Sequence, residues 1–460
     1  MLAAADTPLG STPLLMRSTP AETVPRGAAD PLPKRRYREL LADARRRTLE
    51  LVATVAGADL DRVHDQLMSP LVWDLGHIAL FEDLWLCCRA GGLGLLREDL
   101  APVYDAFETP RAGRGSLPYL RRAPALSLME RVRERALRVL DGADLSPGAD
   151  PLNAGGFVWE MLILHEQQHN ETMLQTLQLA RLGTYVPSRT SLPAATVTAT
   201  PRPATVRVEA GPFVMGAGDG GFAYDNERPQ HEVELAAFEI DRTPVTAGAF
   251  LEFIADGGYR RREWWSDEGW AWRAAESIER PLYWTADGRC RSYERLEPID
   301  PALPVMNVSW YEADAYARSQ GRRLPTEQEW ERAASWDADT AAKRRYPWGD
   351  ASPAPEHANL DATAFSPAPA GAYPAGTAAS GALGMIGDVW EWTASEFDGY
   401  PGFEAFPYRE YSEVSFGAGH KVLRGGSWAT RPRVIHCTFR NWDYPQRRQI
   451  FVGVRCASDG

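Results

Sequence analysis

The spacing of apolar residues changes once along the chain. In the first part, leucine, alanine and valine recur every three or four positions among charged residues, which is the period of an amphipathic helix. This spacing predicts helices over 37–55 and 126–140, a third that begins at Ser69, and a fourth over 153–182. Several helices of this length with modest loops predict an antiparallel four-helix bundle.

Beyond this bundle the apolar runs become short, and Trp, Gly and Pro become frequent. Short apolar runs between turn residues predict β-strands. The predicted strands cover 206–210, 231–240, 421–428 and 450–456, and the predicted helices cover 309–320 and 326–335. The fold class expected for the second half is therefore α+β, with little regular structure and a core held by buried aromatic side chains.

Two stretches lack periodicity. Residues 1–33 are rich in Ala, Pro, Thr and Ser, which predicts a disordered leader. Residues 188–204 are rich in Pro, Thr and Ala, which predicts a linker. The expected domains are therefore a helical bundle over 34–187 and an α+β domain over 205–460.

Charge and cysteine content narrow the functional classes. Lys and Arg number 50 against 62 Asp and Glu, and the net charge of -12 argues against binding nucleic acid through bulk charge. No stretch approaches the roughly 20 apolar residues of a membrane span, and the N-terminus shows no secretory signal. The five cysteines are sparse and form no CxxC pair, so we expect a cytoplasmic protein without a disulfide framework.

The helix predicted over 153–182 carries two histidines, His165 and His169. Side chains four residues apart leave the same face of a helix, and apolar residues share this face, so both imidazoles should point inward. Two inward imidazoles at this spacing can bind one cation from a rigid element. A pair of core histidines with satisfied hydrogen bonds is the alternative.

A third nitrogen is expected from the helix that begins at Ser69, with Ser69 as its N-cap and Pro70 as its first residue. Trp73, His77 and Phe81 would then share one stripe, so His77 should face the bundle interior, although alone it would be a core histidine. Three imidazoles on one side of a cation leave open positions for substrate and oxygen, as in facial iron(II) sites. Zinc accepts the same ligands.

The run HEQQH also matches the H-E-x-x-H motif of zinc proteases, in which the Glu is the general base. A metzincin would continue with Gly three residues after the second His and with a further His. Here that position is Thr172, and the run that follows holds no His. A zinc hydrolase is therefore an alternative that lacks its expected continuation.

Three segments of the first half, LMSPLVWDLGHIALFEDLWL, YDAFETPRAGRGSLPYL and HEQQHNETM, resemble the DinB-like N-terminal domain of ergothioneine-pathway sulfoxide synthases. In the second half, RRLPTEQEWERAA, GALGMIGDVWEWTAS and FRNWDYPQRRQIFVGVRCA are similar to the formylglycine-generating-enzyme fold, a C-type-lectin-like domain. Each second-half motif alone marks only the fold. The fusion of the two domains makes the resemblance specific.

The resemblance implies a non-haem iron(II) enzyme that uses O2 to couple a thiol to C2 of the imidazole in hercynine (N-α-trimethylhistidine) and leaves a sulfoxide. By the match, His77, His165 and His169 are the iron ligands. The leading prediction places this site in a cleft between the two domains.

Hercynine carries a quaternary ammonium, which cannot donate a strong hydrogen bond and is recognised by aromatic faces and amide oxygens. The resemblance assigns these contacts to Gln168, Asn441 and Trp442. In a chain with 16 Trp, a core indole is the alternative for Trp442.

The thiol donor implied by the match is γ-glutamyl-cysteine, which has two carboxylates and one ammonium. Arg111 and Arg114 in PRAGR, with Asp443 and Arg447 in NWDYPQR, match the positions that bind this dipeptide in actinobacterial-type members. Arginine forks suit carboxylates, and an aspartate suits an ammonium. Each Arg taken alone would be a solvated surface charge. A related synthase that uses a selenosugar, which has no carboxylate, is the close alternative.

Oxygen activation also requires a proton or electron donor near the iron. The loop GYPGFEAFPYREYSE offers Tyr400, Tyr408 and Tyr411. The YxxY pair resembles the active-site tyrosines of the family, with Tyr408 as the catalytic phenol and Tyr411 as a substrate-lining residue. Aromatic packing in a Pro-rich loop is the alternative.

The second domain suggests two further functions. The formylglycine-generating enzyme requires two nearby C-terminal cysteines that bind copper, and Cys437 and Cys456 lack the matching spacing. Lectin-like domains often only bind ligands, so a non-catalytic binding module is the alternative from a different class.

Overall fold

The computed structural model describes residues 32–182, 189–193, 204–417 and 419–460. Nearly all of the predicted leader (1–33) and most of the predicted linker (188–204) lie outside the described residues. The chain divides into two compact units. The helical unit comprises the chain up to His169 together with Ala405–Tyr411, and the C-terminal unit comprises Asn170–Glu404 and Ser412–Gly460. The expected domain boundaries remain predictions.

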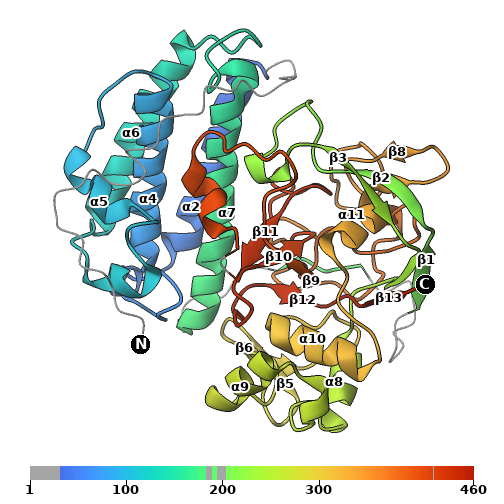
Figure 1. Cartoon of the computed structure of the whole chain (residues 1–460). Helices are drawn as coiled ribbons and strands as arrows, with labels where there is room; N and C mark the ends of the chain where they lie inside the picture. Colours follow the sequence, from blue (N-terminus) through green and yellow to red (C-terminus); the bar gives the residue numbers. More distant parts are fainter. Residues whose placement is uncertain (1–31, 183–188, 194–203, 418) are drawn as a thin grey trace. The chain divides into compact units, whose positions relative to one another are not determined.

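Four long helices form the bundle of the helical unit, as predicted. They are α2 (Lys34–Ala53), α4 (Leu71–Glu82), α6 (Arg122–Gly142) and α7 (Phe157–Ala180), which lie side by side (Figure 1). The shorter elements are α3 (Gly57–Leu60), α5 (Ala101–Tyr104), a π-helix at Asp83–Arg89, and 3-10 helices at Glu98–Leu100, Arg111–Ser116, Ala154–Gly156 and Arg409–Tyr411. The helix α7 is continuous across the division, with its residues from Asn170 onward in the C-terminal unit.

The predicted N-cap of α4 is wrong. The helix begins at Leu71, and Pro70 is the capping residue, with φ -55° and ψ 137°. The hydroxyl of Ser69 instead accepts a hydrogen bond of 2.7 Å from Nη1 of the buried Arg114. The Ser69 hydroxyl, which was expected to cap the helix, is therefore hydrogen-bonded to the Arg114 guanidinium instead.

Helix α4 is buried along its whole length, so each of its polar side chains needs a partner inside the protein. The buried polar residues on it are Asp74, His77 and Glu82, which are 2%, 4% and 2% exposed. A helix that buries both an imidazole and two carboxylates uses them for binding or for buried ion pairs.

The C-terminal unit is α+β, as predicted from the short apolar runs. Its four-stranded sheet has the order β11 (Asn441–Asp443), β10 (Lys421–Arg424), β9 (Trp390–Glu396) and β12 (Val452–Gly453), in which only the β9–β12 pair is parallel. A three-stranded sheet has the order β1 (Thr205–Val208), β4 (Phe238–Asp241) and β13 (Ala457–Asp459).

The described residues of this unit also form three two-stranded ribbons, four α-helices, and 3-10 helices at Asp225–Glu227, Arg262–Trp264, Pro374–Gly376 and Glu413–Ser415. The ribbons are β2–β3 (Gly211–Met215 and His231–Leu235), β5–β6 (Arg289–Ser292 and Arg295–Pro298) and β7–β8 (Trp336–Asp337 and Ala342–Lys343). The helices are α8 (Ala247–Ala255), α9 (Asp267–Ala275), α10 (Trp310–Ser319) and α11 (Glu327–Ser335).

The helices predicted over 309–320 and 326–335 are confirmed as α10 and α11, and each begins with a capping box, Ser309 with Glu312 and Thr326 with Glu329. The single strand predicted over 231–240 is wrong. The segment forms β3 and β4, which pair with different partners, β2 and β1. Residues 231–240 look like one strand in the sequence, but their two halves pair with different strands.

The last turns of α7 are tied into the C-terminal unit by a buried carboxylate, Glu171. It accepts hydrogen bonds from Trp390 Nε1 at 2.7 Å, Ser427 Oγ at 2.8 Å and Thr430 Oγ1 at 2.7 Å. Burial raises the pKa of Glu171 above its ordinary value, and the three donors lower it in part. His169 lies two residues before Glu171, so the same helix carries both this carboxylate and a predicted metal ligand.

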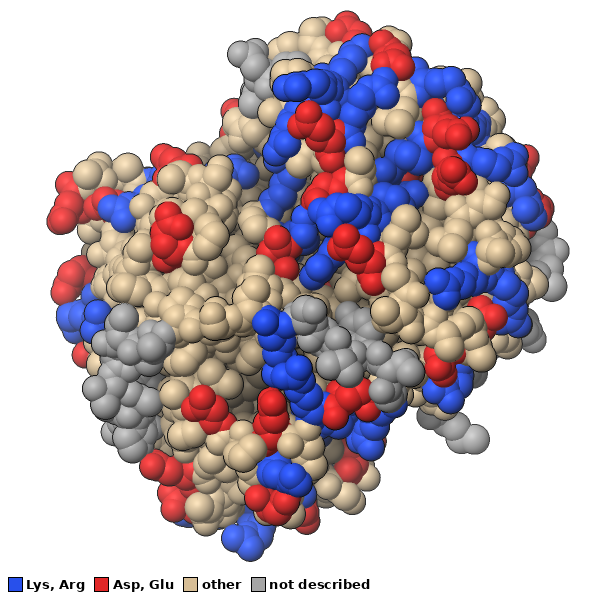
Figure 2. Space-filling model, turned by 180° about the vertical axis from the view of Figure 1, so that it is seen from behind, with Lys and Arg blue, Asp and Glu red and all other residues tan. Residues whose placement is uncertain are grey.

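The charged surface is mixed. On the face shown in Figure 2, Lys and Arg side chains lie interspersed with Asp and Glu. On α2, for example, Arg46 pairs with Asp43 and with Glu50. None of the described helices combines the length and the apolar character needed to cross a lipid bilayer.

Candidate metal centre

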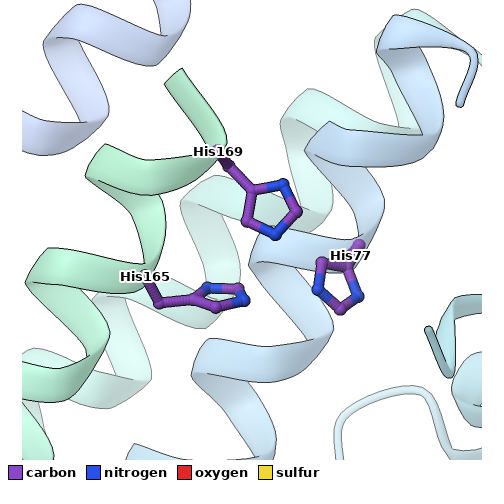
Figure 3. A group of neighbouring side chains, drawn as sticks. All are labelled: His77, His165 and His169. Carbon is purple, nitrogen blue, oxygen red and sulfur yellow. The ribbon is translucent and has the colours of Figure 1, made fainter. Parts of the chain in front are cut away.

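Three imidazoles converge inside the helical unit. His165 and His169 project from successive turns of α7, and His77 projects toward them from α4 (Figure 3). One ring nitrogen from each residue can be chosen so that all three lie within 4.8 Å of one another. The ring centroids are 4.6 to 5.2 Å apart. The structure therefore brings together the three residues that the sequence nominated as ligands.

The hydrogen-bond partners of these rings leave nitrogens available. His77 Nδ1 lies 2.9 Å from the carbonyl oxygen of Tyr104, so it donates there and turns Nε2 toward the other rings. Within the described residues, the buried Nδ1 atoms of His165 and His169 have no hydrogen-bond partner. One nitrogen of each ring can lie within 4.8 Å of the others, which fits a bound cation. A carbonyl that orients a ligating histidine is common at metal sites.

The electrostatics favour neutral imidazoles. Removal from water lowers the pKa of His77 well below its ordinary value, with a further contribution from His169, and the pKa of His165 is lowered in the same direction for the same reasons. A neutral imidazole keeps a lone pair for a metal.

Aromatic rings wall the cluster. Trp73 stacks on His77 with 4.9 Å between ring centroids and an interplanar angle of 10°, and Phe81 stacks on His165 at 4.0 Å and 16°. The stripe predicted for α4 thus surrounds the imidazoles with apolar surface. Such walls exclude water and limit how far the ligand rings can rotate.

A carboxylate that the sequence analysis missed lies beside the cluster. Asp74 Oδ1 is 3.3 Å from His169 Nδ1, a distance that permits attraction without hydrogen-bond geometry, and its Oδ2 has no partner among the described residues. A carboxylate next to a ligating imidazole orients the ring and raises its basicity. The signal available in the sequence was an Asp three positions before His77, in an otherwise apolar run.

A glycine allows the His77 contact. A Cβ built on Gly76 would overlap the ring of Tyr104. The close approach of α4 to α5 at this point brings the Tyr104 carbonyl within reach of His77. Gly76 is therefore needed for its lack of a side chain.

The tyrosine segment Ala405–Tyr411 is part of the helical unit, far in sequence from the rest of it. Tyr408 is 3% exposed and stacks on Trp85 with 4.8 Å between centroids, and its ring lies 6.4 Å from that of Phe81. Tyr411 follows at 6.2 Å from Tyr408. Because Phe81 also stacks on His165, a single aromatic side chain contacts both the tyrosine and the histidine cluster.

Trp85 is the second residue that the sequence analysis missed. It belongs to the π-helix Asp83–Arg89 that follows α4, and it is fully buried. Its Nε1 has no hydrogen-bond partner in the part of the chain that the structure describes. Single π-helical turns are frequent at functional sites because they shift side chains out of the regular helical register.

The two predicted arginines of the first half both lie on one 3-10 helix, Arg111–Ser116, but differ in environment. Arg114 is 6% exposed, donates to the Thr109 and Ala106 carbonyls and to Ser69, and lies 3.7 Å from the Trp73 ring centroid. Burial lowers its pKa to about 10. Arg111 is less buried and donates to the carbonyl of Leu67 at 3.4 Å. Arg114 thus organises the loop from which Arg111 projects.

The remaining predicted substrate contacts are divided between the units. Gln168 is half-buried on α7, next to His169 in the helical unit. Asn441, Trp442 and Asp443 form β11 in the C-terminal unit, where Trp442 stacks on Phe397 at 4.0 Å.

Arg447 lies close to that strand, with Nε 3.4 Å from Asp443 Oδ1. The structure therefore groups the ligands with the tyrosines in one unit and the NWD residues with Arg447 in the other.

The Glu of the H-E-x-x-H motif is not placed for general-base catalysis. Glu166 is 2% exposed, and its carboxylate is held by Arg45 at 2.8 Å, Arg133 at 3.1 Å and Thr48 at 2.8 Å. Burial would raise its pKa, but Arg45 and Arg133 lower it below the ordinary value. A carboxylate occupied by two guanidinium groups and a hydroxyl cannot take a proton from a metal-bound water, so the zinc-protease interpretation loses its base.

The cysteines offer no second metal group among the described residues, where the three-histidine cluster is the one set of potential ligands. All five cysteines are free thiols, and Cys437 and Cys456 are buried. Burial raises the pKa of Cys437. An inert buried thiol suits packing and not copper chemistry.

Two family matches divide the chain in the same order as the sequence analysis. Residues 40–173 match the DinB superfamily, and residues 191–460 match the sulfatase-modifying factor enzyme 1-like domain. The first match contains the three histidines, and the second contains the tyrosine segment and β11.

Three curated proteins are similar to this chain over 91–92% of its length. The chain is 48% identical over 432 residues to a hercynine oxygenase of Mycolicibacterium thermoresistibile, which covers 91% of this chain and 94% of that protein. It is 47% identical to the hercynine oxygenase of Mycobacterium tuberculosis over 91% of this chain and 97% of that protein, and 46% identical to that of Mycolicibacterium smegmatis over 92% and 99%. With both domain families matched in this order and 94–99% of the length of these relatives covered, the chain belongs to the hercynine oxygenase family.

Proposed function

We propose that this protein is a non-haem iron(II), O2-dependent sulfoxide synthase of ergothioneine biosynthesis. It would join the sulfur of γ-glutamyl-cysteine to C2 of the hercynine imidazole. The observation that carries the proposal is the convergence of three imidazoles with available nitrogens within 4.8 Å, in a chain 46–48% identical to hercynine oxygenases.

The metal would be held by His77, His165 and His169. Bound iron(II) would supply redox chemistry with O2 at the positions that three protein nitrogens leave open. The protein contributes the orientation of the rings, through the Tyr104 carbonyl and Asp74, and the apolar walls that keep bulk water away.

Hercynine recognition would use the predicted set Gln168, Asn441 and Trp442. One face of the Trp442 indole stacks on Phe397, and the other face would contact the quaternary ammonium. Gln168, which precedes His169 on α7 and is half-buried, would supply an amide oxygen.

The dipeptide would be held by charge complementarity. Arg447 and Asp443 already form a loose pair at 3.4 Å, so together they offer a fork for a carboxylate and an acceptor for an ammonium. Arg111 would take the second carboxylate. Arg114 is predicted to bind as well, and its hydrogen bonds to the loop support a role in presenting Arg111.

Tyr408 would donate a proton during sulfoxide formation. A tyrosine phenol carries one donor proton at neutral pH. The Trp85 ring fixes the Tyr408 ring, and Phe81 lies against both Tyr408 and His165. Tyr411 would line the substrate space.

Mass-spectrometric product analysis tests the proposal. The purified chain is incubated with hercynine, γ-glutamyl-cysteine, iron(II) and air, and the expected product is the hercynine–dipeptide sulfoxide. Parallel reactions contain a selenosugar in place of the dipeptide, or zinc in place of iron.

A selenium-containing product without a sulfoxide would favour the selenium pathway. Substrate binding without O2 consumption would favour a non-catalytic module. Hydrolysis that depends on zinc would favour the hydrolase.

A further inference from the structure

Four charged side chains are buried together in the helical unit, one from each long helix. Arg45 comes from α2, Glu82 from α4, Arg133 from α6 and Glu166 from α7. The two carboxylates are 2% exposed, and the arginine side chains are 10% and 12% exposed. We name this set the charge ring.

The ring is closed, because each carboxylate contacts both guanidinium groups. Arg45 lies 2.6 Å from Glu82 and 2.8 Å from Glu166, and Arg133 lies 2.5 Å from Glu82 and 3.1 Å from Glu166. The outer donors are also used. Arg45 Nη1 donates to the Met129 carbonyl at 3.0 Å, and Arg133 Nη1 donates to the Leu41 carbonyl at 2.5 Å.

Stability alone does not explain such a ring. The cost of desolvating buried charges roughly cancels their attraction, and apolar residues of similar volume serve at least as well in many cores. Buried ionic groups do, however, fix register, since a small rotation of one helix leaves a charge unpaired. The four helices joined here have one alignment in which all four charges are satisfied.

The ring lies directly beside the metal ligands in sequence. Glu166 follows His165, and Glu82 follows Phe81, which stacks on His165. Successive side chains leave a helix about 100° apart, so a partner that holds Glu166 also fixes the direction of His165. Glu82 sets the rotation of α4, from which His77 projects, in the same way.

We propose that the charge ring is a positioning device for the metal centre: Arg45 and Arg133 lock α7 and α4 in rotation and so set the separation of the three ligand nitrogens. The proposal rests on the metal site of the proposed function and is independent of its substrates and product. It assigns the Glu of the H-E-x-x-H run to the support of the ligands.

The test uses the full chain stripped of metal and titrated with Co(II), whose visible absorption reports ligand number and geometry. Glu82→Gln removes one charge and keeps the shape, and Arg133→Met removes a guanidinium from a helix that carries no ligand. Both variants should bind Co(II) about 10- to 100-fold more weakly and show an altered spectrum, since loss of outer-shell support has effects of this size.

Asp83→Asn is the matched control. Asp83 is also fully buried, follows Glu82 and pairs with Arg135 of α6 at 2.6 Å, but is not part of the ring. Its variant should lose thermal stability to a similar degree, while Co(II) affinity and spectrum stay those of the unaltered protein. Arg133→Lys keeps the charge and should recover part of the affinity.

Ring variants with the affinity and spectrum of the unaltered protein would overturn the proposal, as would an Asp83→Asn variant that loses metal equally. If Arg133→Met does not fold, Glu82→Gln and Arg133→Lys decide the question. An unaltered protein with no spectrum of nitrogen-bound Co(II) would instead refute the metal site of the proposed function.

Discussion

Each unit contains a histidine that is removed from water, but the side chains around the two histidines differ. In the C-terminal unit, His436 is 6% exposed, and its Nδ1 lies 2.9 Å from Thr438 Oγ1 and 3.5 Å from Glu227. In the helical unit, the ring of His165 lies 5.2 Å from that of His77 and 4.6 Å from that of His169, and its Nδ1 has no hydrogen-bond partner within the described residues. Burial lowers the pKa of both residues well below the ordinary value. A lowered pKa therefore does not identify the site, whereas three imidazoles with one nitrogen each within 4.8 Å of the others do.

Two tyrosines of one loop, Tyr400 and Tyr408, also differ in the unit into which they pack. Tyr400 packs in the core of the C-terminal unit with Phe213 and Met215, and Arg440 lies 4.2 Å from its ring centroid. Tyr408, a few residues later, packs on Trp85 in the helical unit. Tyr400 packs in a core, whereas Tyr408 packs on Trp85 and on Phe81, which stacks on His165. The histidines and tyrosines of the site can therefore be tested against buried counterparts in the C-terminal unit.

The largest effect is expected from His165→Ala. Loss of one of three ligands should abolish iron binding and turnover, with affinity reduced by at least about 100-fold. His436→Gln is the control, since it removes a buried imidazole that has its own partners. Iron content by metal analysis and sulfoxide yield measure both variants. Normal iron stoichiometry and yield in His165→Ala would exclude this site. Iron loss in His436→Gln would show that removing any buried histidine disturbs iron binding.

Tyr408→Phe should leave iron binding intact and shift the product from sulfoxide toward oxidised thiol, because the phenol proton is lost while the ring still packs on Trp85. Tyr400→Phe should keep the product ratio. The measurement is the ratio of sulfoxide to oxidised dipeptide at equal O2 consumption. An unchanged ratio in Tyr408→Phe would remove this tyrosine from the mechanism.

The sequence predicted those parts of the site that depend on helical periodicity. The spacing of His165 and His169 requires only that the segment be a helix, and the stripe of α4 fixes the direction of His77. Tyr408 lies in an irregular loop, so its place came from the resemblance alone. Asp74 and Trp85 were missed because their roles depend on contacts with residues distant in sequence and on a π-helical shift.

The fold shows the same limit. Composition and apolar spacing predicted the bundle and the α+β domain. The cap of α4 and the strand over 231–240 were wrong because Arg114 captures Ser69, and because β3 and β4 pair in different sheets. Local rules fail where a tertiary partner competes for the same group.

Gly76→Ala tests whether the close approach of α4 to Tyr104 is needed for the metal site. The new methyl group would meet the Tyr104 ring, and overpacking of this kind costs about 1–3 kcal/mol. Moving Tyr104 also displaces the carbonyl that orients His77, so Co(II) affinity should fall together with the melting temperature. Gly57→Ala, where a Cβ meets nothing within 4 Å, should change neither. Unchanged metal affinity in Gly76→Ala would show that the Tyr104 contact is dispensable.

The smallest effect on the site is expected from Asp388→Asn in the C-terminal unit. Burial raises the pKa of Asp388 from 3.8 to about 6, although Ala368 N and Asn359 Nδ2 donate to its Oδ1 at 2.7 and 2.9 Å. The folded protein therefore holds this proton more tightly than the unfolded chain. The resulting stabilisation is complete below pH 3.8 and is lost as the pH rises through about 6.

An amide at this position cannot ionise and still accepts both hydrogen bonds. The free energy of unfolding of Asp388→Asn, relative to that of the unaltered protein, should therefore rise between pH 4 and pH 6–7 by up to about 3 kcal/mol, as a shift of two pKa units allows. Urea unfolding at several pH values measures the difference, and Co(II) affinity should not change. Parallel stability curves would show that Asp388 ionises normally. A change in metal affinity would show instead that a buried group of the C-terminal unit affects the cluster, against the contrast drawn between the two histidines.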